Sequence, residues 1–153
     1  MPIHMQSQVR RMTFDQACLE RSTRAILDDV GEASAELGIL FVGDQRMRSL
    51  NRQYRGNDRT TDVLAFAMRE ARTPHALRRA QGRLALLTPD LLGDVVISVP
   101  TAWRQAIETG RSLNEELTCL LVHGILHLCG YDHETDNGEM NKRELELRRK
   151  LKI

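Results

Sequence analysis

Long apolar runs, aromatic residues and paired cysteines are all scarce in this 153-residue sequence. No stretch approaches the roughly 20 apolar residues of a membrane-spanning helix, and the N-terminus lacks the apolar core of a secretion signal. The three cysteines are an odd number without metal-type spacing, which is typical of free thiols in a reducing compartment. With aromatics at only 4%, the core must be mainly aliphatic. These absences predict a cytoplasmic protein without a membrane partner.

Lysine is also scarce, since 19 of the 22 basic residues are arginine. A planar guanidinium can bind two phosphate oxygens at once. Although the net charge of the chain is only +1, ten arginines lie between Asp44 and Arg83 against four acidic residues. This asymmetry favours a phosphate-rich partner; the alternative is a solvated surface that only confers solubility. The length predicts a single domain over residues 1–153.

The most specific feature is the segment 123–133, which reads His-Gly-Ile-Leu-His-Leu-Cys-Gly-Tyr-Asp-His. On a helix, His123 and His127 leave the same face one turn apart. Gly130 stands where a helix commonly ends, so the reversed chain can bring His133 back to that face. Three histidines with a fourth position open are typical of a catalytic zinc site, although they also suit nickel, copper or cobalt. The apolar neighbours predict that this helix is buried.

Periodicity and capping signals predict an α+β fold, with a small mixed sheet packed against helices and the histidine pair on a central helix. The expected strands are a weak one over 3–9 and stronger ones over 35–42, 61–68 and 92–99. The expected helices run from a Thr13–Gln16 capping box to Gly31, from Asp44 to about Gln53, from Pro100 to Gly110, from a Ser112–Glu115 capping box to Gly130, and onward from Thr135 or Asp136. Residues 70–90 are rich in arginine and broken by proline and glycine, so we expect an exposed loop there.

With these motifs in view, the sequence resembles the YbeY family of bacterial metal-dependent endoribonucleases, the rRNA maturation factors. The resemblance rests on the histidine motif and on segments 51–66 and 92–98. It implies an α+β fold, one zinc-like ion on His123, His127 and His133, and a functional role for Arg55. It also implies action on single-stranded RNA in 16S rRNA 3′-end processing and ribosome quality control, with rRNA and the ribosome or its small-subunit components as partners.

The spacing is also that of the metzincin zinc proteases, but Gly124 occupies the position of their general-base glutamate. Phosphodiester cleavage instead requires stabilisation of phosphorane charge, which a metal ion and an arginine can supply. We therefore expect Arg55 to bind the non-bridging phosphate oxygens, with Asp132 in a supporting or capping role. Two alternatives stay open: a zinc metallopeptidase, and a non-catalytic ribosome-assembly factor whose metal only stabilises the fold.

Overall fold

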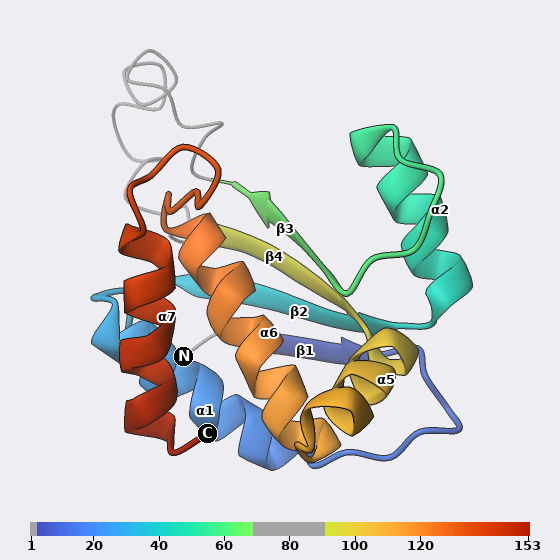
Figure 1. Ribbon diagram of the computed structural model, residues 1–153, viewed down its shortest axis with the longest axis horizontal. Helices are drawn as coiled ribbons and strands as arrows, with labels where there is room; N and C mark the ends of the chain where they lie inside the picture. Colours follow the sequence, from blue (N-terminus) through green and yellow to red (C-terminus); the bar gives the residue numbers. More distant parts are fainter. Residues whose placement is uncertain (1–2, 69–90) are drawn as a thin grey trace, which may run out of the picture.

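The computed structural model describes residues 3–68 and 91–153. In these ranges the chain forms an α+β fold of one four-stranded sheet and five helices (Figure 1). The strands are β1 (Ile3–Ser7), β2 (Glu36–Val42), β3 (Val63–Ala67) and β4 (Leu91–Ser98). The helices are α1 (Gln16–Asp29), α2 (Asp44–Arg55), α5 (Val99–Thr109), α6 (Leu113–Leu128) and α7 (Glu139–Leu151). The predicted fold class is confirmed, whereas the loop expected over 70–90 lies outside the described residues.

The sheet is mixed, with strand order β1-β2-β4-β3. The first three of these strands are parallel, and β3 runs antiparallel to β4 at one edge. Val95 in β4 stands beside Ile39 of β2 and Ala65 of β3. Because side chains alternate along a strand, Val95 and Val96 face opposite sides of the sheet. Both faces of the sheet are therefore apolar at the centre, and helices must pack on each face to exclude water.

Helices cover the two faces unequally. On one face α1, α6 and α7 pack over a large core, with α6 in contact with β3, β4 and its neighbouring helices (Figure 1). On the other face α2 packs Met47 and Leu50 against Leu64 and Val96. Eleven of the sixteen residues of α6 are buried, which confirms the predicted central helix. No helix in the described ranges combines the length and apolarity needed to cross a membrane.

Three of the predicted helix starts are wrong in detail, and the first two are those of α1 and α2. The cap of α1 is Asp15 and not Thr13, and its carboxylate accepts a hydrogen bond from the backbone N–H of Cys18. Asn114, which is distant in sequence, bonds both the N–H and the carbonyl of Asp15 and so fixes that start. At α2 the cap is Gly43, and Asp44 is the first helical residue, whose carboxylate accepts hydrogen bonds from Ser98 and Thr101. Tertiary contacts decided both positions.

The helix that carries the histidine pair begins as predicted. Ser112 accepts a hydrogen bond from the N–H of Glu115, and the Glu115 carboxylate accepts one from the N–H of Ser112. The reciprocal pair satisfies two donors at the helix start, so α6 has a fixed register. The last helix begins at Glu139, later than predicted, and Asp136 accepts hydrogen bonds from the N–H groups of Gly138 and Met140 just before and inside it.

Candidate metal centre and its cleft

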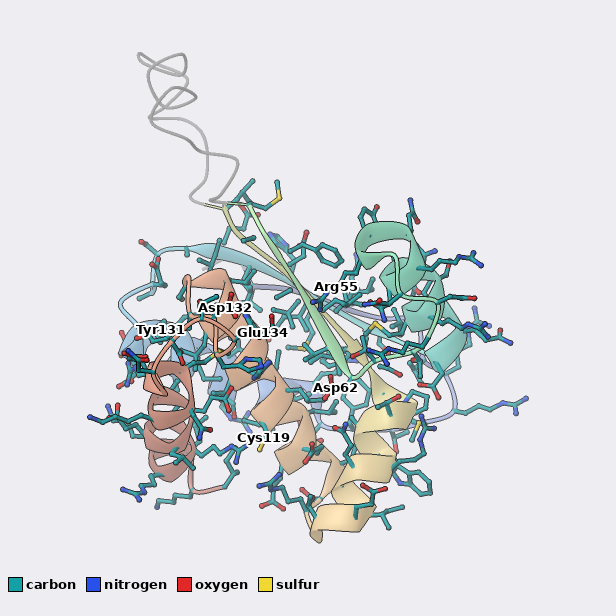
Figure 2. The ribbon with its side chains drawn as sticks, turned by 45° about the horizontal axis from the view of Figure 1, so that its top comes forward. Arg55, Asp62, Cys119, Tyr131, Asp132 and Glu134 are labelled. Atoms are coloured by element: carbon teal, nitrogen blue, oxygen red, sulfur yellow. The ribbon has the colours of Figure 1, made fainter. Side chains whose placement is uncertain are left out.

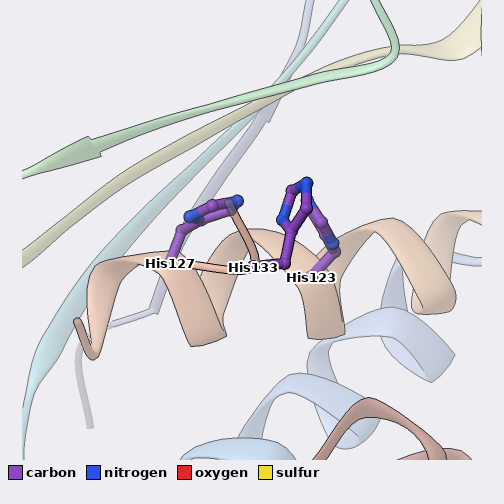
Figure 3. A group of neighbouring side chains, drawn as sticks. All are labelled: His123, His127 and His133. Carbon is purple, nitrogen blue, oxygen red and sulfur yellow. The ribbon is translucent and has the colours of Figure 1, made fainter. Parts of the chain in front are cut away.

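The three predicted histidines lie together at the C-terminal end of α6 (Figure 3). The rings of His123 and His127 are 4.7 Å apart between centroids, as expected one helical turn apart. Gly130 has a φ of +99°, a left-handed conformation that glycine adopts without a Cβ penalty. The chain reverses there and returns His133 to within 5.6 Å of the His123 ring and 5.7 Å of the His127 ring.

The donor set fits a single transition-metal ion. One ligand-type nitrogen from each of the three histidines lies within 4.8 Å of the other two. Burial lowers the pKa of His127, and the adjacent rings of His123 and His133 lower it further, against a weaker opposing effect of Asp132. A lowered pKa keeps this imidazole neutral at pH 7, the form that binds a metal. The residues present therefore suit zinc or a similar ion.

Glu144 is a neighbour of this group that sequence reasoning missed. Its Oε1 lies 2.5 Å from Nδ1 of His123, and its side chain is only 15% exposed. A signal was present in the sequence, since Glu144 stands four residues after Met140 and three before Leu147, which are both buried. That spacing puts a carboxylate on the inward face of α7, where an unpartnered charge would be costly.

Gly124 lets α6 lie directly on the sheet. A Cβ at this position would be 2.8 Å from Cγ1 of Val95 and 3.4 Å from Cγ2 of Val63. Real Cβ contacts are longer than the first of these distances, and Val95 is completely buried. Because even one carbon lacks space, a glutamate side chain has no room between the helix and the sheet.

An open cleft of about 680 Å³ lies over the three histidines. Its walls come from two distant parts of the chain, with Arg55 and Asp62 on one side and Tyr131, Asp132 and Glu134 on the other (Figure 2). Alternate residues of β3 complete the lining. The fold thus brings the predicted Arg55 and the histidine group to the same cavity.

Arg55 is the last residue of α2, which ends because Gly56 takes a left-handed φ of +74°. Its side chain is exposed, and no ion pair among the described residues uses it. Arg48, by contrast, makes two hydrogen bonds of 2.9 and 3.1 Å to the carboxylate of Asp58. Within the described part of the chain, Arg55 is therefore the arginine of α2 that lines the cleft with its guanidinium uncommitted.

Two carboxylates that line the cleft accept hydrogen bonds from backbone N–H groups. Asp62 accepts a 2.8 Å hydrogen bond from the N–H of Val63, and Gln105 donates to its other oxygen at 3.2 Å. Asp132 accepts a 3.0 Å hydrogen bond from the N–H of Glu134, as in a capped turn. These contacts fit the supporting role predicted for Asp132.

The fold and the site define a class: an α+β protein with three histidines, able to hold one metal ion, facing an open cleft that an arginine also lines. The family model described as endoribonuclease YbeY matches residues 4–152, and the chain belongs to that family. Endoribonuclease YbeY of Desulforamulus reducens is 48% identical over 112 residues, which are 73% of this chain and 68% of that protein. The protein of the same name from Geobacter metallireducens is 38% identical over 148 residues, 97% of this chain and 91% of that one.

A solved structure shares the fold. The solution structure of TM1509 from Thermotoga maritima matches with a TM-score of 0.60 at 22% identity, over 98% of this chain and 91% of that one. The agreement spans nearly the whole chain, so the arrangement of sheet and helices described above is one that a solved protein adopts.

Proposed function

We propose that this chain is a metal-dependent endoribonuclease that cleaves single-stranded RNA. The observation that carries the proposal is the meeting in one cleft of three histidines and an arginine that has no ion-pair partner among residues 3–68 and 91–153, in a member of the endoribonuclease YbeY family. His123, His127 and His133 would hold the ion, and zinc is the metal that their number and chemistry favour. A bound divalent cation supplies Lewis-acid charge for a phosphate oxygen or a water molecule.

Arg55 supplies the second positive charge. Its guanidinium can donate two parallel hydrogen bonds to the non-bridging oxygens of the scissile phosphate. These bonds strengthen as negative charge grows in the transition state, so they accelerate cleavage beyond their effect on binding. Asp132 supports the 131–135 turn that carries His133, through its bond to the N–H of Glu134.

Family membership supports a proposal about the biological setting. We propose that residues 1–153 act as one domain in the cytoplasm, in maturation of the 16S rRNA 3′ end and in ribosome quality control, with rRNA and small-subunit components as partners. The metallopeptidase alternative lacks its proton acceptor, because Gly124 takes the place of the glutamate and its surroundings admit no larger side chain.

The proposal is tested by metal analysis combined with cleavage of a defined single-stranded RNA. Wild-type protein should bind one equivalent of zinc and cleave the RNA, and folded His123→Ala should do neither. Arg55→Ala should keep the metal and lose about 10²–10³-fold in kcat/KM, the usual effect of removing a group that stabilises transition-state charge. Arg52→Ala removes an exposed arginine one turn earlier on α2 and should behave as wild type.

The controls separate this function from its rivals. RNA cleavage by a folded, metal-free His123→Ala protein would contradict a catalytic role for the ion. Folded, zinc-loaded wild-type protein that cleaves neither RNA nor peptide would favour the assembly-factor alternative. Cleavage of an unstructured peptide substrate by wild type, without RNA cleavage, would favour the metallopeptidase. Mapping the product termini would identify whether water or the RNA 2′-hydroxyl attacks.

A further inference from the structure

Glu144 differs from the other acidic side chains on its helix. It is 15% exposed and its Oε1 lies 2.5 Å from Nδ1 of His123, whereas Glu146 on the same helix is 46% exposed and pairs with Arg143. The contact joins α7 to α6 across 21 residues of sequence. Burying a carboxylate to this extent lowers the stability of the folded protein unless a specific partner compensates for the lost hydration.

The helix that carries Glu144 is held firmly. Arg143 pairs with the carboxylate of Asp29 at 2.7 Å and donates a 3.0 Å hydrogen bond to its backbone carbonyl. Met140 and Leu147 are buried in the core on either side of Glu144. The ion pair with Asp29 of α1 and the apolar packing both fix α7. The Glu144 carboxylate is therefore held in a fixed position beside the His123 ring.

Asp136 and Glu144 both border a hollow behind the histidines, but the Asp136 carboxylate is bonded to the backbone and not to a histidine ring among the described contacts. The hollow has a volume of about 380 Å³ and is bordered by His123, His133, Asp136 and Glu144. Both carboxylate oxygens of Asp136 accept hydrogen bonds from backbone N–H groups, those of Gly138 and Met140. Of these two carboxylates, Glu144 is the one in hydrogen-bond contact with a histidine ring.

We propose that Glu144 is a positioning residue of the metal centre: it accepts a hydrogen bond from Nδ1–H of His123 and thereby presents Nε2 of that ring as the ligand atom. A neutral imidazole carries one proton, so a carboxylate that fixes this proton on Nδ1 leaves the lone pair on Nε2. It also fixes the plane of the ring. The inference rests on the metal site of the proposed function, and it adds a residue from a third element, α7.

The first test is zinc affinity, measured by competition with a chromophoric chelator at constant pH. Loss of a partner that orients a metal-binding histidine typically weakens binding about 10–100-fold, and we expect that range for Glu144→Ala. Glu144→Gln keeps a carbonyl oxygen that can accept the Nδ1–H bond, so its affinity should lie between those of Ala and wild type. Glu146→Ala, on the exposed side of the same helix, should bind zinc as wild type does.

The second test reads the tautomer directly. Long-range ¹H–¹⁵N NMR of the metal-free wild-type protein should show the His123 proton on Nδ1, and this preference should weaken in Glu144→Ala. A role limited to packing of α7 would change the unfolding temperature without changing the tautomer. If Glu144→Ala fails to fold, the zinc affinity of Glu144→Gln and the His123 tautomer in the wild-type spectrum still test the proposal.

The proposal is overturned if the wild-type ring carries its proton on Nε2. It is also overturned if folded Glu144→Ala binds zinc within about twofold of wild type, or if Glu144→Gln binds no better than a folded Glu144→Ala. Failure of wild-type protein to bind zinc at all would contradict the proposed function itself, so the two failures are distinguishable.

Discussion

At the scale of single residues, Gly124 links the packing of the protein to its chemistry. A glycine inside a helix ordinarily lowers stability by about 1 kcal/mol relative to alanine. Here the missing side chain lets α6 approach Val95 and Val63 closely, with the two metal-binding candidates His123 and His127 on either side of it. The missing side chain is also the one that would carry the general-base glutamate of a zinc protease. The close packing at Gly124 therefore distinguishes this protein from the zinc proteases with the same histidine spacing.

We predict that Gly124→Ala destabilises the protein despite its better helix propensity. Its Cβ would lie 2.8 Å from a methyl group of Val95, which is buried and, being β-branched, stiff. Overpacking of this kind costs about 1–3 kcal/mol, and over most of that range the cost is larger than the propensity gain of about 1 kcal/mol. The free energy of unfolding, measured by urea denaturation, should therefore fall.

A Val95→Ala background provides the control for this prediction. With the two methyl groups removed, Gly124→Ala should become neutral or stabilising relative to Val95→Ala alone, and the double-mutant cycle should show strong coupling. Equal effects of Gly124→Ala in both backgrounds would show that close packing at this site is not what requires glycine.

At the scale of elements, Asp44 fixes the helix that ends at Arg55. Its carboxylate accepts hydrogen bonds from Ser98 at 2.7 Å and Thr101 at 2.6 Å, and pairs with Arg104 at 2.8 Å. Burial alone would raise the pKa of Asp44, but these hydrogen bonds outweigh it and hold the pKa below its ordinary value. The first residue of α2 is thereby tied to the end of β4 and the start of α5, and the helix carries Arg55 out to the cleft.

We predict that Asp44→Asn lowers the free energy of unfolding at pH 7 by about 1 kcal/mol, since charge-assisted hydrogen bonds are lost at a site that is one-third exposed. Because the pKa of the folded state is depressed, this contribution is present above the unfolded-state pKa near 4 and is lost as the pH falls through the lower folded value. Denaturation curves of the two proteins should therefore converge below about pH 4.

Asp58→Asn is the matched control for this experiment. Asp58 pairs with Arg48 on the surface of α2, where both side chains are more than half exposed. An ion pair in such a position contributes little, so Asp58→Asn should remain close to wild type at every pH. An Asp44→Asn deficit that persists undiminished at low pH would contradict the assigned origin of the effect.

At the scale of the whole molecule, the candidate metal centre brings together side chains from three consecutive parts of the chain. His123 and His127 belong to α6, His133 to the turn that follows it, and Glu144 to α7. A ligand that binds only the folded state stabilises it by an amount set by its concentration relative to Kd. A metal ion held by these histidines should therefore stabilise the folded protein.

We predict that zinc at about 100 times its Kd raises the free energy of unfolding by roughly 2.7 kcal/mol. For a chain of this size, that corresponds to an increase in Tm of roughly 5–10 °C. His133→Ala should remove the increase while leaving the Tm of the metal-free protein nearly unchanged, because His133 is exposed on its turn. Thermal unfolding with and without zinc, after treatment with a chelator, measures both effects.

His4→Ala serves as the control, since His4 is an exposed histidine on β1 that pairs with Glu36 away from the cleft. It should keep the full zinc-dependent increase in Tm. An equal loss of that increase in His4→Ala and His133→Ala would indicate non-specific zinc binding.

The sequence alone determined the local part of this protein. The Ser112–Glu115 capping box, the four-residue spacing of His123 and His127, and Gly130 are each set by contacts within a few residues, so their geometry follows from helix periodicity and backbone sterics. The fold class followed in the same way from the succession of apolar patterns.

Only the tertiary structure decided which distant residues meet. Arg55 reaches the histidine cleft because β3 pairs antiparallel with β4 and brings the end of α2 toward α6, and Glu144 reaches His123 because α7 folds back against α6. The side chain of Asp44 does not cap α2; its carboxylate instead accepts hydrogen bonds from Ser98 and Thr101, which are more than 50 positions away in the sequence. These contacts depend on chain reversals and packing over the whole core, whose free energy is shared among many residues and is not encoded in any one segment.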